Sequence, residues 1–106
     1  MIPCNCIVQA GQVSAETEAV LRANLNDFTQ RSFGEPAEIN WTAIPEGSGF
    51  TAAKPSTSSI ISVRANAPLA QSDRADLLRE LCGMWARETG RSLDEIVGVL
   101  SDPQPN

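Results

Sequence analysis

The stretch that decides the fold is SIISVRANAPLAQSDRADLLRELCGMWARETGRSLDEIVGVL, residues 59 to 100. It begins with an apolar run at 60–63, continues into an amphipathic segment at 73–89, and ends with a second apolar run at 96–100. Side chains at helical spacing form one stripe along the middle segment: Leu78, Leu81, Cys82, Trp85 and Thr89. The stretch therefore predicts a strand, a helix and a second strand, with a connection long enough for the two strands to be parallel.

The predicted helix has recognisable ends. Ser72 is suited to cap its first turn, and Gly90 to stop it in a left-handed conformation. Ser92 and Glu95 then stand at the spacing of a capping box. We expect a short helical turn there, directly before the last strand.

The first 44 residues repeat this plan. Residues 4–10 alternate in polarity and predict a strand, and residues 38–44 predict a second one. Between them, Ser14 caps a helix that ends at Gly34, and the stripe of this helix consists of Thr17, Val20, Leu21, Leu25, Phe28, Ser32 and Phe33. Residues 45–58 predict a loop with a short hairpin around Phe50. We predict one domain over residues 1–106, with a degenerate repeat formed by residues 1–44 and 59–102.

Two β-α-β units joined in this way predict a four-stranded sheet with both helices on one face, a two-layer sandwich of the α/β (α+β) class. The strands at 60–63 and 96–100 are apolar on both sides, which is typical of a sheet covered on both faces. The 106 residues leave no segment for a third layer. We therefore expect other copies of the chain to cover the open face.

Composition narrows the classes of function. The net charge of -5 gives no basic surface for nucleic acid or an anionic membrane, so we expect neither as a partner. No apolar segment approaches the ~20 residues of a membrane span, and the first residues lack the features of a signal peptide. The expected location is the cytoplasm.

The chain contains no histidine, which removes Ser-His and Cys-His nucleophile pairs and the commonest general base. Cys4 and Cys6 alternate on a predicted strand, and Cys82 belongs to a helix stripe. A C-x-C pair could bind a soft metal, but small buried thiols are the simpler interpretation. We expect no metal site and no cofactor.

The sequence resembles the tautomerase superfamily, in particular macrophage migration inhibitory factor and the cis-3-chloroacrylic acid dehalogenases. Order and spacing carry the resemblance, through the first strand, the Ser14 helix and four further segments: Ile44-Pro45-Glu46-Gly47, Ala70-Gln71-Ser72-Asp73-Arg74 with Leu77-Leu78, Cys82-Gly83, and Thr89-Gly90-Arg91-Ser92-Leu93-Asp94-Glu95-Ile96. The resemblance implies a homotrimer with active sites near the start of the first strand, at subunit boundaries. It also implies proton transfer on a small organic acid without a cofactor.

The chemistry of that family depends on a proline whose nitrogen is free at the amino terminus. Counted back from Gly11, the corresponding position is held by Ile2, and the nearest proline is Pro3. Behind Ile2 the nitrogen of Pro3 is an amide without a basic lone pair. Pro3 is thus either a general base exposed by unusual trimming or a proline tolerated at the start of a strand.

Other candidates follow from the same resemblance. Arg64 lies near the end of the third strand, where family members hold a substrate carboxylate with arginine, although Leu69 and Gln71 stand where dehalogenase-like relatives carry further arginines. The alternative for Arg64 is a surface or subunit-interface ion pair. Ile2, Trp41 and Asp102 are candidates for the substrate pocket. The alternative is core packing for Trp41 and a solvated carboxylate for Asp102.

Two functions remain open at this point. The first is a tautomerase-like enzyme acting on a small 2-keto, enol or unsaturated carboxylic acid, with weak activity because the terminal proline is displaced. The second is a catalytically inactive trimer that binds small molecules or serves as a scaffold. Fold cannot decide between them, because function depends on the site.

Overall fold

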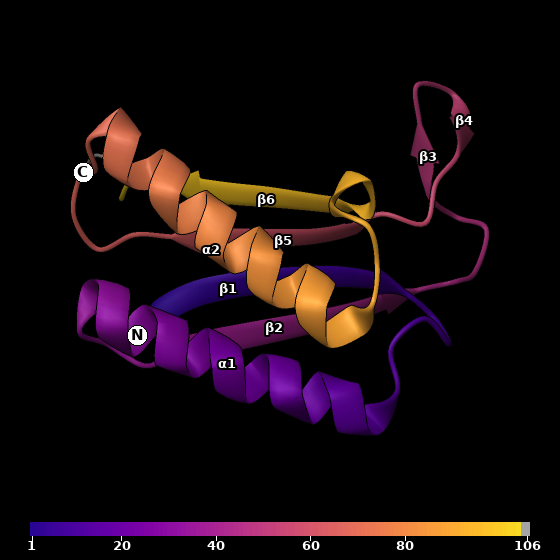
Figure 1. Cartoon of the computed structure of the whole chain (residues 1–106), viewed down its shortest axis with the longest axis horizontal. Coiled ribbons are helices and arrows are strands. Elements are labelled where there is room, and N and C mark those ends of the chain that lie inside the picture. Colours follow the sequence, from indigo (N-terminus) through magenta and orange to yellow (C-terminus); the bar gives the residue numbers. More distant parts are fainter. Residues whose placement is uncertain (105–106) are drawn as a thin grey trace.

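The chain forms a four-stranded sheet with two helices packed on one of its faces (Figure 1). This arrangement comes from a computed structural model that describes residues 1–104. The elements of the sheet layer and its two helices are β1 (Ile2–Gln9), α1 (Ala15–Phe33), β2 (Ala37–Ile44), β5 (Ser59–Arg64), α2 (Gln71–Thr89) and β6 (Ile96–Ser101). A small hairpin of β3 (Phe50–Thr51) and β4 (Lys54–Pro55) projects from the body, and the 3-10 turn η1 (Leu93–Glu95) precedes β6.

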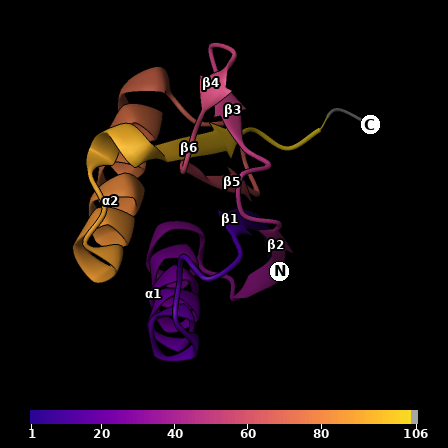
Figure 2. The same cartoon turned by 90° about the vertical axis from the view of Figure 1, so that its right-hand side faces the viewer.

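The sheet has the strand order β2-β1-β5-β6. Strands β1 and β2 are parallel and joined through α1, and β5 and β6 are parallel and joined through α2. The two halves meet where β1 and β5 run antiparallel. Viewed from the side, both helices lie on the same side of the sheet and leave its other face open (Figure 2). The predicted two-layer α+β fold is therefore confirmed.

The core lies between the sheet and the helices. Alternate residues of β1 point into it, and α1 and α2 close it with large side chains; its most deeply buried members are Ile2, Cys4, Cys6, Leu21, Leu25, Ile61, Val63, Leu81 and Trp85. Burial raises the pKa of Cys4 to about 11 and that of Cys6 to about 12, so both are neutral thiols at physiological pH. All three cysteines are free, and Cys82 is partly buried.

Most predicted helix ends are present. Ser14 caps α1 by accepting a hydrogen bond from the Thr17 amide, and Gly34 and Gly90 end the two helices in the left-handed conformation. Ser92 and Glu95 form the predicted capping box.

Two local predictions are wrong. Helix α2 begins at Gln71 rather than after Ser72, with Ala70 as an N-cap that makes no side-chain hydrogen bond. The Arg74 guanidinium holds this first turn instead, because it bonds to the carbonyls of Leu69 and Leu100. Val20 was predicted to belong to the apolar stripe of α1, but its side chain is exposed. Other residues of that stripe, Leu21, Leu25 and Phe28, form the face of the helix that is buried.

None of the helices in residues 1–104 is both long and apolar enough to cross a bilayer.

Candidate functional site

A small polar cavity lies on the open face of the sheet. It has a volume of about 110 Å³ and is lined by Pro3, Asn5, Ser62, Arg64 and Ser101. The strand register explains the grouping, because Asn5 pairs with Ser62 across the antiparallel β1–β5 boundary, and Arg64 pairs with Ser101 across β5–β6. Continuing the β1–β5 register by one residue pair brings Pro3 opposite Arg64. The two residues predicted as catalytic thus lie side by side.

The lining of this cavity suits an anion. Arg64 supplies a guanidinium whose planar fork matches a carboxylate, and Ser62, Ser101 and Asn5 supply hydroxyl and amide groups that can donate further hydrogen bonds. No acidic side chain is among the lining residues. A small carboxylate is therefore the ligand that this set of groups would recognise.

Asn5, Ser62 and Ser101 were not predicted as site residues. The sequence does contain a signal for two of them, because Asn5 lies two residues after Pro3 and Ser62 two residues before Arg64, and residues two apart on a strand share a face. Ser101 carries no such signal, since its position next to Arg64 depends on the register of β5 and β6.

The nitrogen of Pro3 is a peptide nitrogen inside β1. The preceding residue, Ile2, is tied to the fold in two ways: its amide donates to the Pro36 carbonyl at 2.9 Å, and its side chain is buried in the core. An amide lone pair is delocalised into the carbonyl and does not accept protons near neutral pH. As long as Ile2 precedes it, Pro3 cannot act as a base.

The amino group of Met1 does not supply a base in place of the Pro3 nitrogen. This group forms an ion pair with Glu35 at 2.8 Å, and Glu35 also accepts a hydrogen bond from Asn66. The hydrogen bond to Glu35, followed by the charge of Glu35, raises the pKa of the amino group above its ordinary value. A raised pKa keeps the amine protonated at neutral pH, which is the opposite of what a general base requires.

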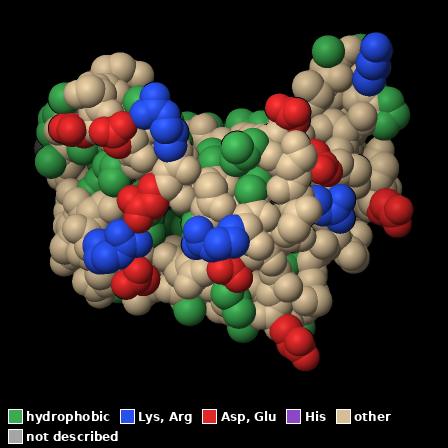
Figure 3. Space-filling view, in the orientation of Figure 1, with side chains coloured by type: hydrophobic (Ala, Val, Ile, Leu, Met, Phe, Trp, Pro, Cys, Tyr) green, Lys and Arg blue, Asp and Glu red, His purple; other side chains and the backbone are tan. Residues whose placement is uncertain are grey.

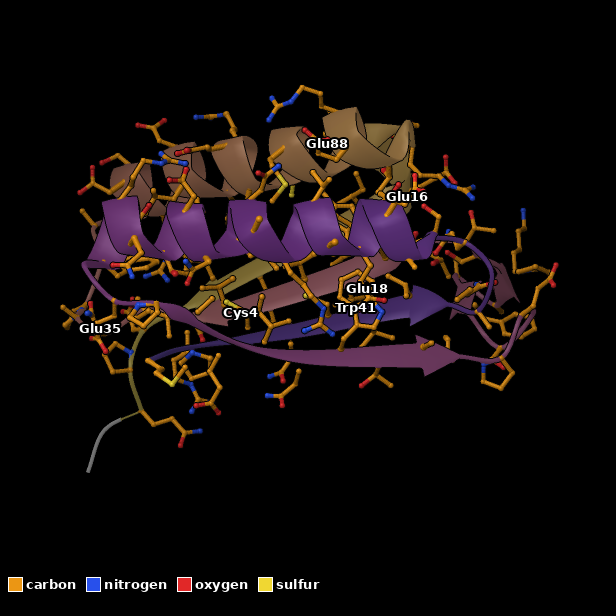
Figure 4. The ribbon with its side chains drawn as sticks, turned by 90° about the horizontal axis from the view of Figure 1, so that it is seen from below. Cys4, Glu16, Glu18, Glu35, Trp41 and Glu88 are labelled. Carbon is orange, nitrogen blue, oxygen red and sulfur yellow. The ribbon has the colours of Figure 1, made fainter. Side chains whose placement is uncertain are left out.

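The three predicted pocket residues lie outside this cavity. Ile2 points into the core on the other face of the sheet. Trp41 stacks on Trp85 with ring centroids 5.8 Å apart, and the Arg22 guanidinium lies 5.5 Å from its ring. Figure 4 accordingly shows Trp41 between β2 and α1. The side chains of Ile2 and Trp41 thus lie between the sheet and the helices rather than on the open face.

Asp102 is engaged in an ion pair just beyond β6. It accepts hydrogen bonds from Arg74 Nη2 at 2.8 Å and from the Leu69 amide at 3.2 Å. The bond from Arg74 is the main cause that lowers the pKa of Asp102, and the Leu69 amide adds to it. The pair joins the start of α2 to the chain that leaves β6, next to Ser101 in the cavity wall.

A second cavity, of about 180 Å³, lies at the opposite end of β1. Its lining residues include Gln9, Gln12, Glu46, Thr57 and Arg91. The Gln9 side chain is buried and bonded to the segment at 45–58, since it donates to the Ser56 carbonyl and accepts from the Gly47 amide. Within residues 1–104, no group of three or more Cys, Asp or Glu side chains gathers that could hold a metal ion.

Comparison with known proteins identifies the fold. No protein-family model and no curated protein matches this sequence. Among solved structures, native Ps01740 matches with a TM-score of 0.87 at 23% identity, over 95% of this chain and 93% of that one. A member of the cis-3-chloroacrylic acid dehalogenase family matches with a TM-score of 0.82 at 16% identity, over 95% of this chain and 74% of that one.

A fused 4-OT, solved as a symmetric trimer, matches with a TM-score of 0.83 at 17% identity, over 95% of this chain and 85% of that one. The chain therefore has the fold of the tautomerase superfamily, as the resemblance in sequence predicted. Identities this low establish the architecture and leave the activity to be argued from the site.

The Arg74–Asp102 pair predicts a specific pH dependence of stability. Because the pKa of Asp102 is lowered by folding, the pair stabilises the protein above the ordinary value of 3.8 and ceases to do so as the pH falls through the lower folded value. Asp102→Asn should therefore destabilise the protein at pH 7, with a difference from the wild type that disappears in acid. Urea unfolding of the wild type and the variant, from pH 7 into acid, measures this difference in the free energy of unfolding.

The same substitution made in an Arg74→Ala background provides the control. Without the guanidinium, replacing Asp102 by Asn should give a smaller pH-dependent difference in the free energy of unfolding, because only the Leu69 amide then holds the carboxylate. An equal pH-dependent difference in both backgrounds would show that Arg74 does not hold the carboxylate.

Proposed function

We propose that this protein binds a small 2-keto, enol or unsaturated carboxylic acid beside Arg64, as a homotrimer, and transfers protons on it only weakly. The observation that carries the proposal is the cavity that Pro3 and Arg64 share with Asn5, Ser62 and Ser101. It lies at the start of the first strand, where the resemblance to the tautomerase superfamily calls for an active site. The substrate carboxylate pairs with Arg64.

The trimer is supported by the open face of the sheet. Ile60, Val97 and Val99 leave apolar surface exposed there, on the strands that are apolar on both sides. A fused 4-OT of the same fold is a symmetric trimer. In this proposal the sheets of three copies cover one another, and each cavity is closed by a neighbouring subunit.

The weak activity follows from the nitrogen of Pro3. A positioned general acid or base contributes roughly 10² to 10⁴-fold to a rate, equivalent to about 3 to 5 kcal/mol of barrier. With Ile2 in place, that contribution is missing, and only binding and the charge of Arg64 remain to stabilise an enolate. The second candidate, a trimer that binds an acid without turning it over, is favoured by the burial of Ile2 in the core.

Binding can be tested separately from catalysis. Arg64→Ala should weaken the binding of phenylpyruvate about 10-fold to 100-fold, because a hydrogen bond to a charged group contributes about 1.5 to 3 kcal/mol. Calorimetric titration measures the affinity, and Arg79→Ala, which removes an exposed arginine of α2, is the matched control. Equal affinity in the Arg64→Ala variant and the wild type would remove Arg64 from the site.

Catalysis can be tested by restoring the missing nitrogen. In an Ile2→Pro variant from which Met1 is removed, the residue at position 2 offers a free secondary amine, so we expect ketonisation of phenylenolpyruvate to rise by ~10² or more. Ile2→Ala, processed in the same way, offers only a primary amine and controls for the lost core side chain. Intact mass confirms which residue begins each chain.

Two outcomes would contradict this account. One is a folded Ile2→Pro variant, shown by mass to begin with proline, that is no faster than the wild type. The other is a wild-type chain that retains Met1 and already turns over the enol at rates typical of enzymes, about 1 to 10³ per second.

A further inference from the structure

An apolar cavity of about 470 Å³ lies on the helical side of the sheet, where α2 passes the turn η1 and the start of β6. Figure 3 shows hydrophobic side chains on this part of the surface, between α2 and η1. Sites that hold small molecules have volumes of about 300 to 1,000 Å³ and mostly apolar linings with few polar groups. This cavity has that size and that kind of lining, which consists of Leu78, Arg79, Cys82, Gly83, Leu93 and Ile96.

The floor of the cavity is fixed by close packing of α2 on β6. A Cβ added to Gly98 of β6 would come within 2.6 Å of the Cys82 sulfur and 3.3 Å of a Leu78 methyl group, so the bare glycine lets the helix lie close to the strand. On the outer side, a Cβ added to Gly83 would meet nothing within 4 Å. The cavity is therefore open above the helix backbone, over a floor of packed side chains.

The outer wall is Leu93, whose side chain is 62% exposed. The turn that carries it is held by the capping box of Ser92 and Glu95, and Glu95 also accepts a hydrogen bond from the Thr57 hydroxyl at 2.8 Å. A large apolar side chain is thus held out toward solvent by a hydrogen-bonded turn. A wall that is already in place lowers the entropy cost of binding a ligand.

The lining favours a molecule without charge. Among the described residues that line the cavity, Arg79 alone is charged, and its guanidinium already bonds to Asp76 at 2.8 Å. The Cys82 thiol is neutral, because burial raises its pKa. A charged ligand would lose hydration here without gaining a free partner, which is costly. In this respect the cavity differs from the one beside Arg64, which suits an anion.

The small extent of the cavity favours a small molecule over a protein. A stable protein interface takes about 20 to 30 residues from each side, far more than line this cavity. We propose that the cavity between α2 and η1 binds an uncharged small molecule with an aliphatic body, which packs on Leu78, Leu93 and Ile96. The proposal does not depend on the anion site, because that site lies on the opposite face of the sheet.

Cys82 provides a reporter inside the cavity. Cys4 and Cys6 are fully buried and Cys82 is partly exposed, so N-ethylmaleimide should alkylate one thiol of the folded chain, as intact mass can count. At about ten times its dissociation constant, 1-octanol should slow this alkylation about 10-fold, because only the free fraction of the protein reacts.

Two related probes test the chemistry of the ligand. 1-Hexanol should need a concentration about 10-fold higher than 1-octanol for the same protection, because it buries two fewer CH₂ groups. Octanoate should also need a concentration about 10-fold higher or more, because its charge finds no free partner.

A substitution in the wall tests the place of binding. Leu93→Ser should raise the concentration of 1-octanol that gives half protection about 10-fold, since most of the apolar wall is lost. Val20→Ser is the matched control, because Val20 is an exposed apolar residue of α1 outside the cavity, and it should leave that concentration unchanged.

Several results would overturn the proposal. A folded chain whose Cys82 does not react would show that the cavity is closed to solvent. Absence of protection up to the solubility limit of 1-octanol, or equal protection in Leu93→Ser and the wild type, would remove the site. Three adducts in the presence of 1-octanol would mean that the alcohol unfolds the chain instead of occupying the cavity. Equal protection by octanoate would assign a carboxylate to Arg79 and contradict an uncharged ligand.

Discussion

The register of β1 is the constraint on which the rest of the structure depends. This strand lies in the middle of the sheet, parallel to β2 on one side and antiparallel to β5 on the other. Its residues alternate between the two faces, so the burial of Ile2, Cys4 and Cys6 against the helices commits Pro3 and Asn5 to the open face. A slip of one residue would exchange the two sets and expose the core.

This constraint joins the packing of the protein to its chemistry. Ile2 stabilises the fold with a buried side chain and an amide bonded to Pro36, and the same position makes the nitrogen of Pro3 an amide. The register that brings Pro3 beside Arg64 therefore gives the cavity groups that suit an anion without providing a base. Glu35 adds to this effect, because it holds the Met1 amine in its charged form.

The sequence was sufficient for the architecture because its strongest signals are local. The helix stripes, the glycines that end both helices and the capping box before β6 each depend on residues within a few turns. The start of α2 was misplaced because Arg74 bonds to Leu100, a contact between distant parts of the chain. For the candidate site, the sequence named Pro3 and Arg64, whereas the place of Ser101 beside Arg64 depends on strand register, and Asp102 is bonded to Arg74 from α2.

The central claim is that the face carrying Pro3 and Arg64 is a surface between copies of the chain. Its exposed apolar side chains lie on β5 and β6, and residues 1–104 form no second layer of helices to cover them. Light scattering at about 1 µM tests this claim most directly. The account predicts the mass of three chains, and the mass of a single chain would contradict it.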